Sequence, residues 1–169
     1  MLACLVLLGL VGSSMAIGGQ CLSRPPSSPA SLLCRMCGHS IVQEAALSHI
    51  RSALALQSWN ETILGRPEMT VQLFRNPQNE EFEVITARKA DVVQSGKAVT
   101  ANSWFPGYAW TVTGCPKCGQ HMGWHFSASI LNAATGELKQ EHFEALILHH
   151  LHSDDFSDSL TLLPKIGPA

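Results

Sequence analysis

The chain has 169 residues, about the length of one domain, and a formal net charge of −2, with 11 Lys and Arg against 13 Asp and Glu. This balance excludes a strongly basic surface, so we expect no electrostatic binding of nucleic acid. Six Cys, eight His and four Trp stand against a single Tyr. This composition points to a metal or disulfide framework and to a special use of indole rings.

The N-terminus has the pattern of a secretory signal. Residues 2–12 form one apolar run, shorter than the roughly 20 residues that span a bilayer, and small residues follow at the spacing of a cleavage site near Ala16. We therefore predict a signal peptide over residues 1–16, a flexible Gly-, Ser- and Pro-rich leader over 17–32, and no membrane span. A buried N-terminal helix is the alternative. Cleavage would leave Cys21 unpaired, either free or joined to another chain.

From residue 33 to 166 the chain reads as one domain without internal repeats. Ser40–Leu56 has apolar residues at helical spacing, which predicts a short helix. The rest alternates short apolar runs with turn signals, which predicts antiparallel strands at Val71–Phe74, Phe82–Thr86, Asp91–Val93, Ala109–Thr113 and Gly123–Ile130, with turns at Asn76–Asn79 and Ser95-Gly96. Phe143–Leu151 fits either a buried strand or a helix. The predicted fold class is therefore mainly β.

Two C-x-x-C units carry the strongest chemical signal in the sequence. Each is followed directly by Gly, which lets the backbone turn back beneath two sulfurs aimed at one spot. Two such turns supply four thiolates, the closed tetrahedral shell of structural zinc. We predict one structural Zn²⁺ held by Cys34, Cys37, Cys115 and Cys118. Disulfides, a redox C-x-x-C and separate surface thiols are the alternatives.

Three of the four Trp lie in one aromatic region. Residues 102–110 read Asn-Ser-Trp-Phe-Pro-Gly-Tyr-Ala-Trp, and residues 123–126 read Gly-Trp-His-Phe. The Pro-Gly pair signals a turn that would bring Trp104 and Trp110 toward each other. On a strand, the Trp and Phe of the second run would face the same side. The three indoles could therefore line one pocket, with ordinary core packing as the alternative.

The run Ser-Trp-Phe-Pro-Gly-Tyr-Ala-Trp-Thr-Val, then Cys-x-x-Cys, then His-x-Gly-Trp-x-Phe, resembles the CULT domain of the cereblon family, the thalidomide-binding domain, over about Leu33 to Ile166. The resemblance implies a β-tent of two antiparallel sheets pinned near their meeting point by a zinc ion on four cysteines. It also implies a cage of three indole walls over a Phe base, with further residues near the ligand: Trp104, Trp110, Trp124, Phe126, Asn102, Ser103, Tyr108 and Asn76. The family carries His at the position of Asn102.

The resemblance implies a binding module for a neutral cyclic imide or amide, glutarimide- or uracil-like, either free or at a protein end. A methyl-ammonium reader is the second possibility, since Trp cages also hold cations. No Asp or Glu occurs between Asp91 and Glu137, which favours a neutral ligand, although Glu80 or Glu81 could approach from another loop. A redox enzyme similar to methionine-R-sulfoxide reductases is the third. Such enzymes also carry twin C-x-x-C units but need a separate nucleophilic Cys, so we expect no enzyme.

The resemblance also bears on partners. Cereblon has a Lon-like region and a segment that docks to a ubiquitin-ligase adaptor, and neither fits within 169 residues. We therefore expect a secreted, stand-alone CULT domain that binds no such adaptor.

Asn60-Glu61-Thr62 is an acceptor triplet for N-glycosylation, which becomes meaningful beside a signal peptide. We expect protein secreted by eukaryotic cells to begin near Ile17 and to carry a glycan on Asn60. N-terminal sequencing checks the cleavage, and glycosidase treatment should lower the apparent mass of the wild type but not of Asn60→Gln. Intact Met1 on protein recovered from a cytosolic fraction would contradict this prediction.

Overall fold

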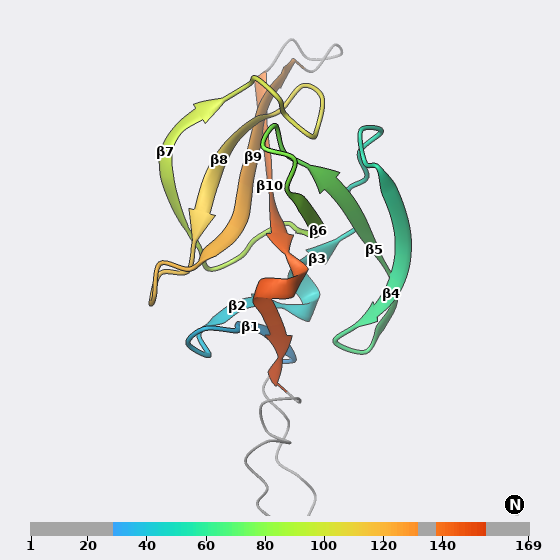
Figure 1. Cartoon of the computed structure of the whole chain (residues 1–169), viewed down its shortest axis with the longest axis vertical. Coiled ribbons are helices and arrows are strands. Elements are labelled where there is room, and N and C mark those ends of the chain that lie inside the picture. Colours follow the sequence, from blue (N-terminus) through green and yellow to red (C-terminus); the bar gives the residue numbers. More distant parts are fainter. Residues whose placement is uncertain (1–28, 132–137, 155–169) are drawn as a thin grey trace, which may run out of the picture.

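The computed structural model describes residues 29–131 and 138–154 (Figure 1). These residues form two antiparallel sheets with almost no helix, which confirms the predicted mainly β class. The predicted signal peptide lies outside the described residues, and the predicted leader overlaps strand β1, which begins at Ser31. Within the described ranges, no helix is both long and apolar enough to cross a bilayer.

The small sheet has the strand order β11-β1-β2, and the large sheet has the order β4-β5-β6-β10-β9-β8-β7, with β3 paired to the side of β6. The strands of the small sheet are β1 (Ser31–Cys34), β2 (Ser40–Gln43) and β11 (Leu151–Ser153). Those of the large sheet are β3 (Leu47–Ser48), β4 (Gln57–Ile63), β5 (Arg66–Arg75), β6 (Glu81–Ala87), β7 (Val93–Val99), β8 (Ala109–Gly114), β9 (His121–Leu131) and β10 (Leu138–Ile147).

Strand β10 stands in the middle of the large sheet and divides it into two wings that diverge from each other (Figure 1). The first wing consists of β4, β5 and β6, and the second of β7, β8 and β9. The small sheet lies at the end where the wings come together. There β1 pairs with β11, so the first and last described strands are neighbours.

The hydrophobic residues form two separate clusters because side chains alternate along β10. Phe143, Ala145 and Ile147 belong to the aromatic core, whereas Leu146 belongs to the lower core. The aromatic core also contains Phe74, Val84, Phe105, Trp124 and Phe126. The lower core joins the small sheet to the large one and contains, among others, Leu32, Cys34, Ile41, Leu47, Met69, Ile85, Cys115, Met122 and Leu151. Both faces of the central strand are therefore covered.

The helix predicted over Ser40–Leu56 shrinks to one 3-10 turn at Glu44–Ala46, flanked by β2 and β3. The apolar residues that suggested a helical face do not share a face. Ile41 and Leu47 are buried in the lower core, whereas Leu54 is 54% exposed. Pairing of β2 with β1 and of β3 with β6 satisfies the backbone instead, so long-range pairing overrides the local periodicity.

Two smaller expectations were wrong, and one open alternative is resolved. The turn predicted at Ser95-Gly96 is an irregularity within β7, where the register with β8 shifts. The strand predicted at Asp91–Val93 begins only at Val93. Phe143–Leu151, left open between strand and helix, is strand as far as Ile147 and then a 3-10 turn at Leu148–His150.

Gly123 permits the close approach of β9 to β10. Its φ is 145°, and a Cβ atom placed there would lie 1.9 Å from the carbonyl oxygen of Ala145. A register shift between β8 and β9 occurs beside it. Any other residue at this position would push apart the two strands that connect the wings.

Gly123→Ala should therefore lower the free energy of unfolding by about 4 kcal/mol or more, because it combines a backbone clash with a strained φ. The control is Gly96→Ala in exposed β7, where φ is also positive, at 90°, but no atom lies within 4 Å of the added Cβ. That change should cost about 1–2 kcal/mol. Urea denaturation of both variants checks the difference, and equal losses would contradict the steric explanation.

Candidate metal centre and aromatic cavity

The two C-x-x-C units fold into the same turn. In each, the amide of the first cysteine donates to the carbonyl five residues later, and the amide of the following glycine donates back to the carbonyl of the first cysteine. The donor–acceptor pairs are Cys34–His39 (2.8 Å) and Gly38–Cys34 (2.8 Å) in the first turn, and Cys115–Gln120 (2.8 Å) and Gly119–Cys115 (2.9 Å) in the second. Gly38 and Gly119 adopt φ of 71° and 75°, which favours glycine. The shared geometry explains why glycine follows both pairs.

The turns bring the four sulfurs into one cluster. The Sγ atoms of Cys34 and Cys118 are 3.7 Å apart, those of Cys37 and Cys115 are 3.6 Å apart, and all four lie within 4.8 Å of one another. A disulfide needs about 2.0 Å between sulfurs, whereas the edge of a tetrahedron with metal–sulfur bonds of about 2.3 Å is about 3.8 Å. The four cysteines are free thiols placed where they could hold one metal ion.

At one of these positions, hydrogen bonds favour the charged form. Desolvation by burial acts to raise the pKa of Cys115, but hydrogen bonds from the backbone of Cys118 and Lys117, together with those from the side chains of Cys37 and Cys118, lower the pKa to about 7. In contrast, burial raises the pKa of the Cys34 thiol. Metal ligands bind as thiolates, so the amides around Cys115 favour the form that a metal needs.

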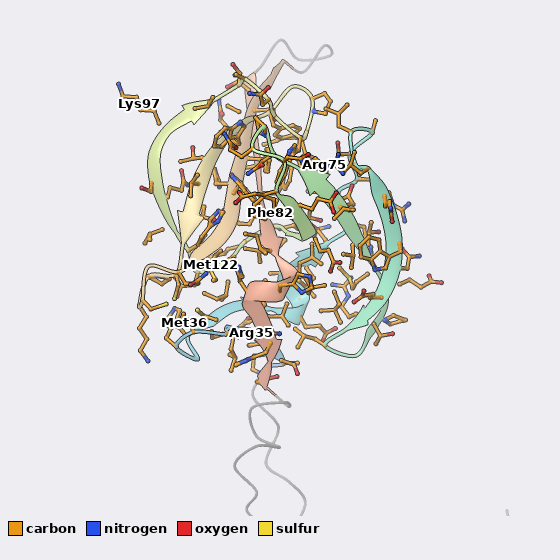
Figure 2. The ribbon with its side chains drawn as sticks, in the orientation of Figure 1. Arg35, Met36, Arg75, Phe82, Lys97 and Met122 are labelled. Carbon is orange, nitrogen blue, oxygen red and sulfur yellow. The ribbon has the colours of Figure 1, made fainter. Side chains whose placement is uncertain are left out.

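A cavity of about 730 Å³ opens between the two wings. The first wing contributes its β5–β6 turn and Phe82 from β6, and the second contributes Trp110, Trp124 and their neighbours. Figure 2 shows Phe82 between the wings, whereas Lys97 on β7 points away from them. The lining residues are Asn76, Pro77, Gln78, Glu80, Glu81, Phe82, Asn102, Trp104, Trp110, Val112, His121 and Trp124. The cavity is therefore aromatic on its walls and polar at the β5–β6 turn.

Trp104 connects the aromatic rings of the two wings. Its indole stacks on Phe74 of the first wing, with centroids 4.8 Å apart and 9° between the planes. It meets Trp124 of the second wing edge to face, at 4.6 Å and 67°. Phe82 also packs edge-on against Trp124, at 5.1 Å and 83°. Such offset and edge-to-face pairs contribute about 0.5–1.5 kcal/mol each beyond the area they bury.

Hydrogen bonds to backbone carbonyls fix the orientation of two indoles. Trp104 donates from Nε1 to the carbonyl of Arg75 (3.2 Å), and Trp110 donates from Nε1 to the carbonyl of Ala101 (2.9 Å). Both N–H groups are thereby used within the protein. The indole faces, and not their N–H groups, remain for a ligand.

The loop that carries Trp104 is anchored by Phe105. This side chain is 3% exposed and contacts Phe74, Phe126 and Phe143 at centroid distances of 5.6, 4.7 and 4.8 Å. A turn closes behind it, where the amide of Tyr108 donates to the Phe105 carbonyl (3.0 Å). Burying a Phe contributes about 1.5–3 kcal/mol, so Phe105 holds the loop from below while Trp104 faces the cavity.

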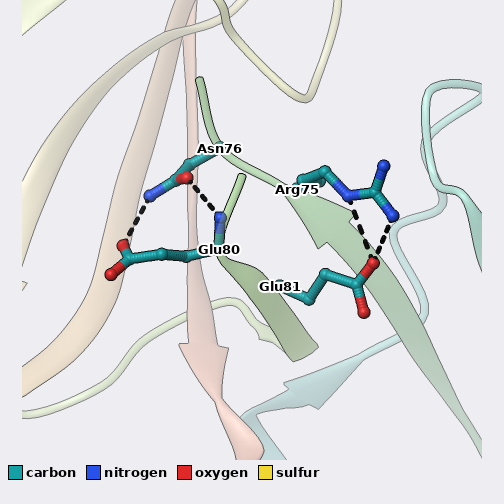
Figure 3. Close-up of polar contacts among 4 residues, drawn as sticks. All are labelled: Arg75, Asn76, Glu80 and Glu81. Carbon is teal, nitrogen blue, oxygen red and sulfur yellow. Dashed lines mark hydrogen bonds and ion pairs between the residues drawn. The ribbon is translucent and has the colours of Figure 1, made fainter. Parts of the chain in front are cut away.

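The β5–β6 turn carries the acidic rim of the cavity (Figure 3). Asn76 accepts from the amide of Glu80 through Oδ1 and donates from Nδ2 to the Glu80 carboxylate, both at 2.8 Å. Arg75 donates to the Glu81 carboxylate from Nε (3.1 Å) and Nη2 (2.5 Å). Each carboxylate at this rim is thus already bonded within the turn.

Of the eight ligand-contact residues that the resemblance implied, five line the cavity: Asn76, Asn102, Trp104, Trp110 and Trp124. The other three do not line the cavity and contact other parts of the protein. Phe126 is 1% exposed and packs on Phe105 and Phe143. The Ser103 hydroxyl donates to the Phe105 carbonyl (3.0 Å), and the Tyr108 hydroxyl donates to Glu141 (3.1 Å).

His121 is a lining residue that the sequence did not single out as a site residue. Its Nε2 donates to the carbonyl of Gly123 (3.1 Å), and its ring packs against Trp124 at a centroid distance of 4.8 Å. Burial lowers the pKa of His121, which favours the neutral ring at neutral pH. With Nε2 donating, the neutral tautomer leaves Nδ1 as an acceptor. The only signal in the sequence was its position two residues before a glycine in the aromatic motif.

Three other lining residues, Phe82, Glu80 and Glu81, were not predicted as site residues, although the sequence left open that Glu80 or Glu81 could approach from another loop. Phe82 was predicted simply as strand. The acidic pair lies outside the aromatic segment in the sequence, and only the pairing of β5 with β6 places it at the rim.

No protein-family model matches the sequence. Part of the chain is similar to cereblon, however: it is 49% identical over 55 residues to the protein cereblon of Gallus gallus, and 48% identical over 54 residues to those of Xenopus tropicalis and Danio rerio. The matched segments make up 32%, 31% and 31% of this chain and 12% of each relative. These similarities, together with the two sheets and the cysteine cluster, support a cereblon-like CULT domain.

Proposed function

We propose that this protein is a zinc-stabilised binding module that holds a neutral cyclic imide or amide, glutarimide- or uracil-like, in its aromatic cavity. The observation that carries the proposal is the convergence of Trp104, Trp110 and Trp124 on one cavity. A flat ring placed there would pack on indole faces, a large contact area with few rotatable bonds to freeze. Such a ligand could be a free small molecule or a modified protein end.

The polar edge of such a ligand would meet the backbone around Asn102–Trp104. Leaving a buried amide unpaired costs about 1–3 kcal/mol, so binding requires donors and acceptors at this edge. The family carries His at the position of Asn102, whose φ of 55° suits Asn and is also tolerated by His. About eight heavy atoms supply limited contact, so we expect affinities of roughly micromolar.

Zinc is the ion we propose for the four-cysteine cluster. An all-thiolate set with tetrahedral spacing is typical of structural Zn²⁺, and it leaves no open coordination position for chemistry. One ion per chain would join the turn after β1 to the turn after β8. Its role would be to hold the sheets together, with no part in a reaction.

A cationic ligand is the second candidate, because Glu80 and Glu81 line the aromatic cavity. Trp cages hold methyl-ammonium groups best with a carboxylate nearby. Here, however, the Glu81 carboxylate is paired with Arg75 and that of Glu80 accepts from Asn76. These bonds reduce the negative charge offered to a ligand, which favours a neutral ring.

We propose no enzymatic activity. A reductase of the methionine-sulfoxide type needs a nucleophilic Cys apart from the metal ligands. All four cysteines within the described residues belong to the cluster, and Cys4 and Cys21 lie outside those residues.

We also propose that the protein is secreted, that Asn60 carries a glycan, and that no ubiquitin-ligase adaptor binds. Asn60 is exposed on β4, an edge strand, which leaves room for a glycan. The apolar run at residues 2–12 supports secretion. The matched segment is 12% of each cereblon relative, so their other interactions need not extend to this protein.

Removal of the metal should unfold much of the domain, because metal binding and folding are coupled in such sites. We expect one Zn²⁺ per chain by elemental analysis, and loss of β-sheet circular dichroism after chelation. Cys118→Ala should lower both metal content and thermal stability. Folded, metal-free protein with disulfides by mass spectrometry would overturn the zinc assignment.

Trp110→Ala should abolish glutarimide binding while leaving the zinc content and the melting temperature close to wild type, because Trp110 is a partly exposed wall of the cavity. Titration with glutarimide, uridine and trimethyl-lysine, followed by Trp fluorescence, is the measurement. Trp59→Ala on β4 is the matched control, since that indole lies outside the cavity and donates to Glu61. Asn102→His should strengthen binding modestly.

Two results would contradict the proposal. Unchanged glutarimide binding by Trp110→Ala would show that the cage is assigned wrongly. Quenching of the fluorescence by trimethyl-lysine alone would favour the cationic ligand instead.

A further inference from the structure

The irregular segment between β3 and β4, residues 49–56, is held in place by two buried polar side chains. Thr86 of β6 donates from Oγ1 to the carbonyl of Ser48 (2.9 Å) and accepts from the amide of Ile50 (3.1 Å). Gln72 of β5 accepts from the amide of Ser52 (2.7 Å) and donates to the carbonyl of Ile50 (2.9 Å). Both side chains are 1% exposed. Their hydrogen bonds to backbone groups take the place of those that a neighbouring strand would make.

Ser52 is the last residue of this segment to which the Gln72 side chain is hydrogen-bonded, and its hydroxyl bonds to the loop that carries Trp104. Its Oγ donates to the carbonyl oxygen of Trp104, and it accepts from the amide of Leu54 at 3.0 Å. The donor and one acceptor position of the hydroxyl are both used. The Ser52 side chain therefore connects residues 49–56 to the backbone of Trp104.

Trp104 is consequently held at two points. Its carbonyl accepts from Ser52, and its indole Nε1 donates to Arg75 at 3.2 Å. Between these two points the ring is stacked on Phe74. Rotation of the indole would break the Nε1 bond or the stacking on Phe74, whereas the bond from Ser52 fixes the backbone from which the ring projects.

We propose that Ser52 is a positioning residue of the aromatic cavity, which fixes the backbone of Trp104 and thereby the orientation of its indole. Ser52 is not among the cavity-lining residues, so its influence on a ligand passes through Trp104. Its bond uses one of the two acceptor positions of the Trp104 carbonyl. The part of this proposal that concerns ligand affinity rests on the proposed function, whereas the part that concerns Trp104 does not.

The test uses the full chain labelled with ¹⁵N-tryptophan and follows the indole N–H signals by NMR, with Trp104→Phe to assign the signal of Trp104. Ser52→Ala removes the hydroxyl, so the Trp104 signal should shift and its N–H should exchange faster with solvent. The indole signals of Trp59 and Trp110 should stay in place, because their partners are Glu61 and Ala101.

Two variants serve as controls. Ser52→Thr keeps a hydroxyl and should restore the wild-type position of the Trp104 signal, a rescue that a change in packing alone would not give. Ser40→Ala removes an exposed hydroxyl from β2 in the small sheet and should leave all indole signals unchanged.

The same variants should differ in glutarimide affinity. Ser52→Ala should weaken binding by about threefold to tenfold, the range expected for loss of one hydrogen bond, and Ser52→Thr should remain within about twofold of wild type. A wild-type protein that binds no glutarimide would count against the proposed function, while the Trp104 signal would still decide the role of Ser52.

A Trp104 signal in Ser52→Ala that coincides with wild type would overturn the proposal. A shift of all indole signals together with a loss of thermal stability would also contradict it, because Ser52 would then support the whole fold and not Trp104 in particular.

Discussion

The four-cysteine cluster is the constraint on which the arrangement of the sheets depends. It joins a turn of the small sheet to the turn between β8 and β9, through sulfur pairs 84 and 78 positions apart in the sequence. Cys34 and Cys115 also belong to the lower core, so the cluster and the apolar contacts hold the same junction. Closing a long loop costs entropy that grows only slowly with its length, and a metal ion bound by the four thiolates would offset that cost at a single point.

The aromatic cavity follows from where this junction lies. Phe74, Phe82 and the β5–β6 turn come from one wing, Trp110 and Trp124 from the other, and Trp104 contacts rings of both. A change in the angle between the wings would therefore alter the cavity without altering any residue in it. The wings are continuous through β10, and the glycine that lets β9 approach β10 is next to Trp124. The geometry of the sheet and that of the cavity therefore depend on the same pair of strands, β9 and β10.

The chemical character of the cavity comes from hydrogen bonds that the protein makes to itself. Two indole N–H groups donate to backbone carbonyls, the acidic rim is bonded within its own turn, and the Trp104 carbonyl accepts from Ser52. Aromatic faces, a few backbone groups and Nδ1 of His121 remain for a ligand. This combination is the basis of the proposed binding of a small flat ring with one polar edge.

The sequence by itself determined the features that depend on local spacing. Each C-x-x-C-Gly unit specifies its own turn, and alternation with turn residues specifies most strands, so the cysteine cluster and the mainly β class were predictable. Only the tertiary structure decided what depends on pairing between distant strands. The apolar spacing of Ser40–Leu56 indicated a helix because periodicity is read along one segment, whereas the residues there are divided between two sheets. Pairing likewise placed Phe126 on Phe105, brought Glu80 to the cavity and set Ser52 behind Trp104, since contacts across a sheet have no counterpart in local sequence.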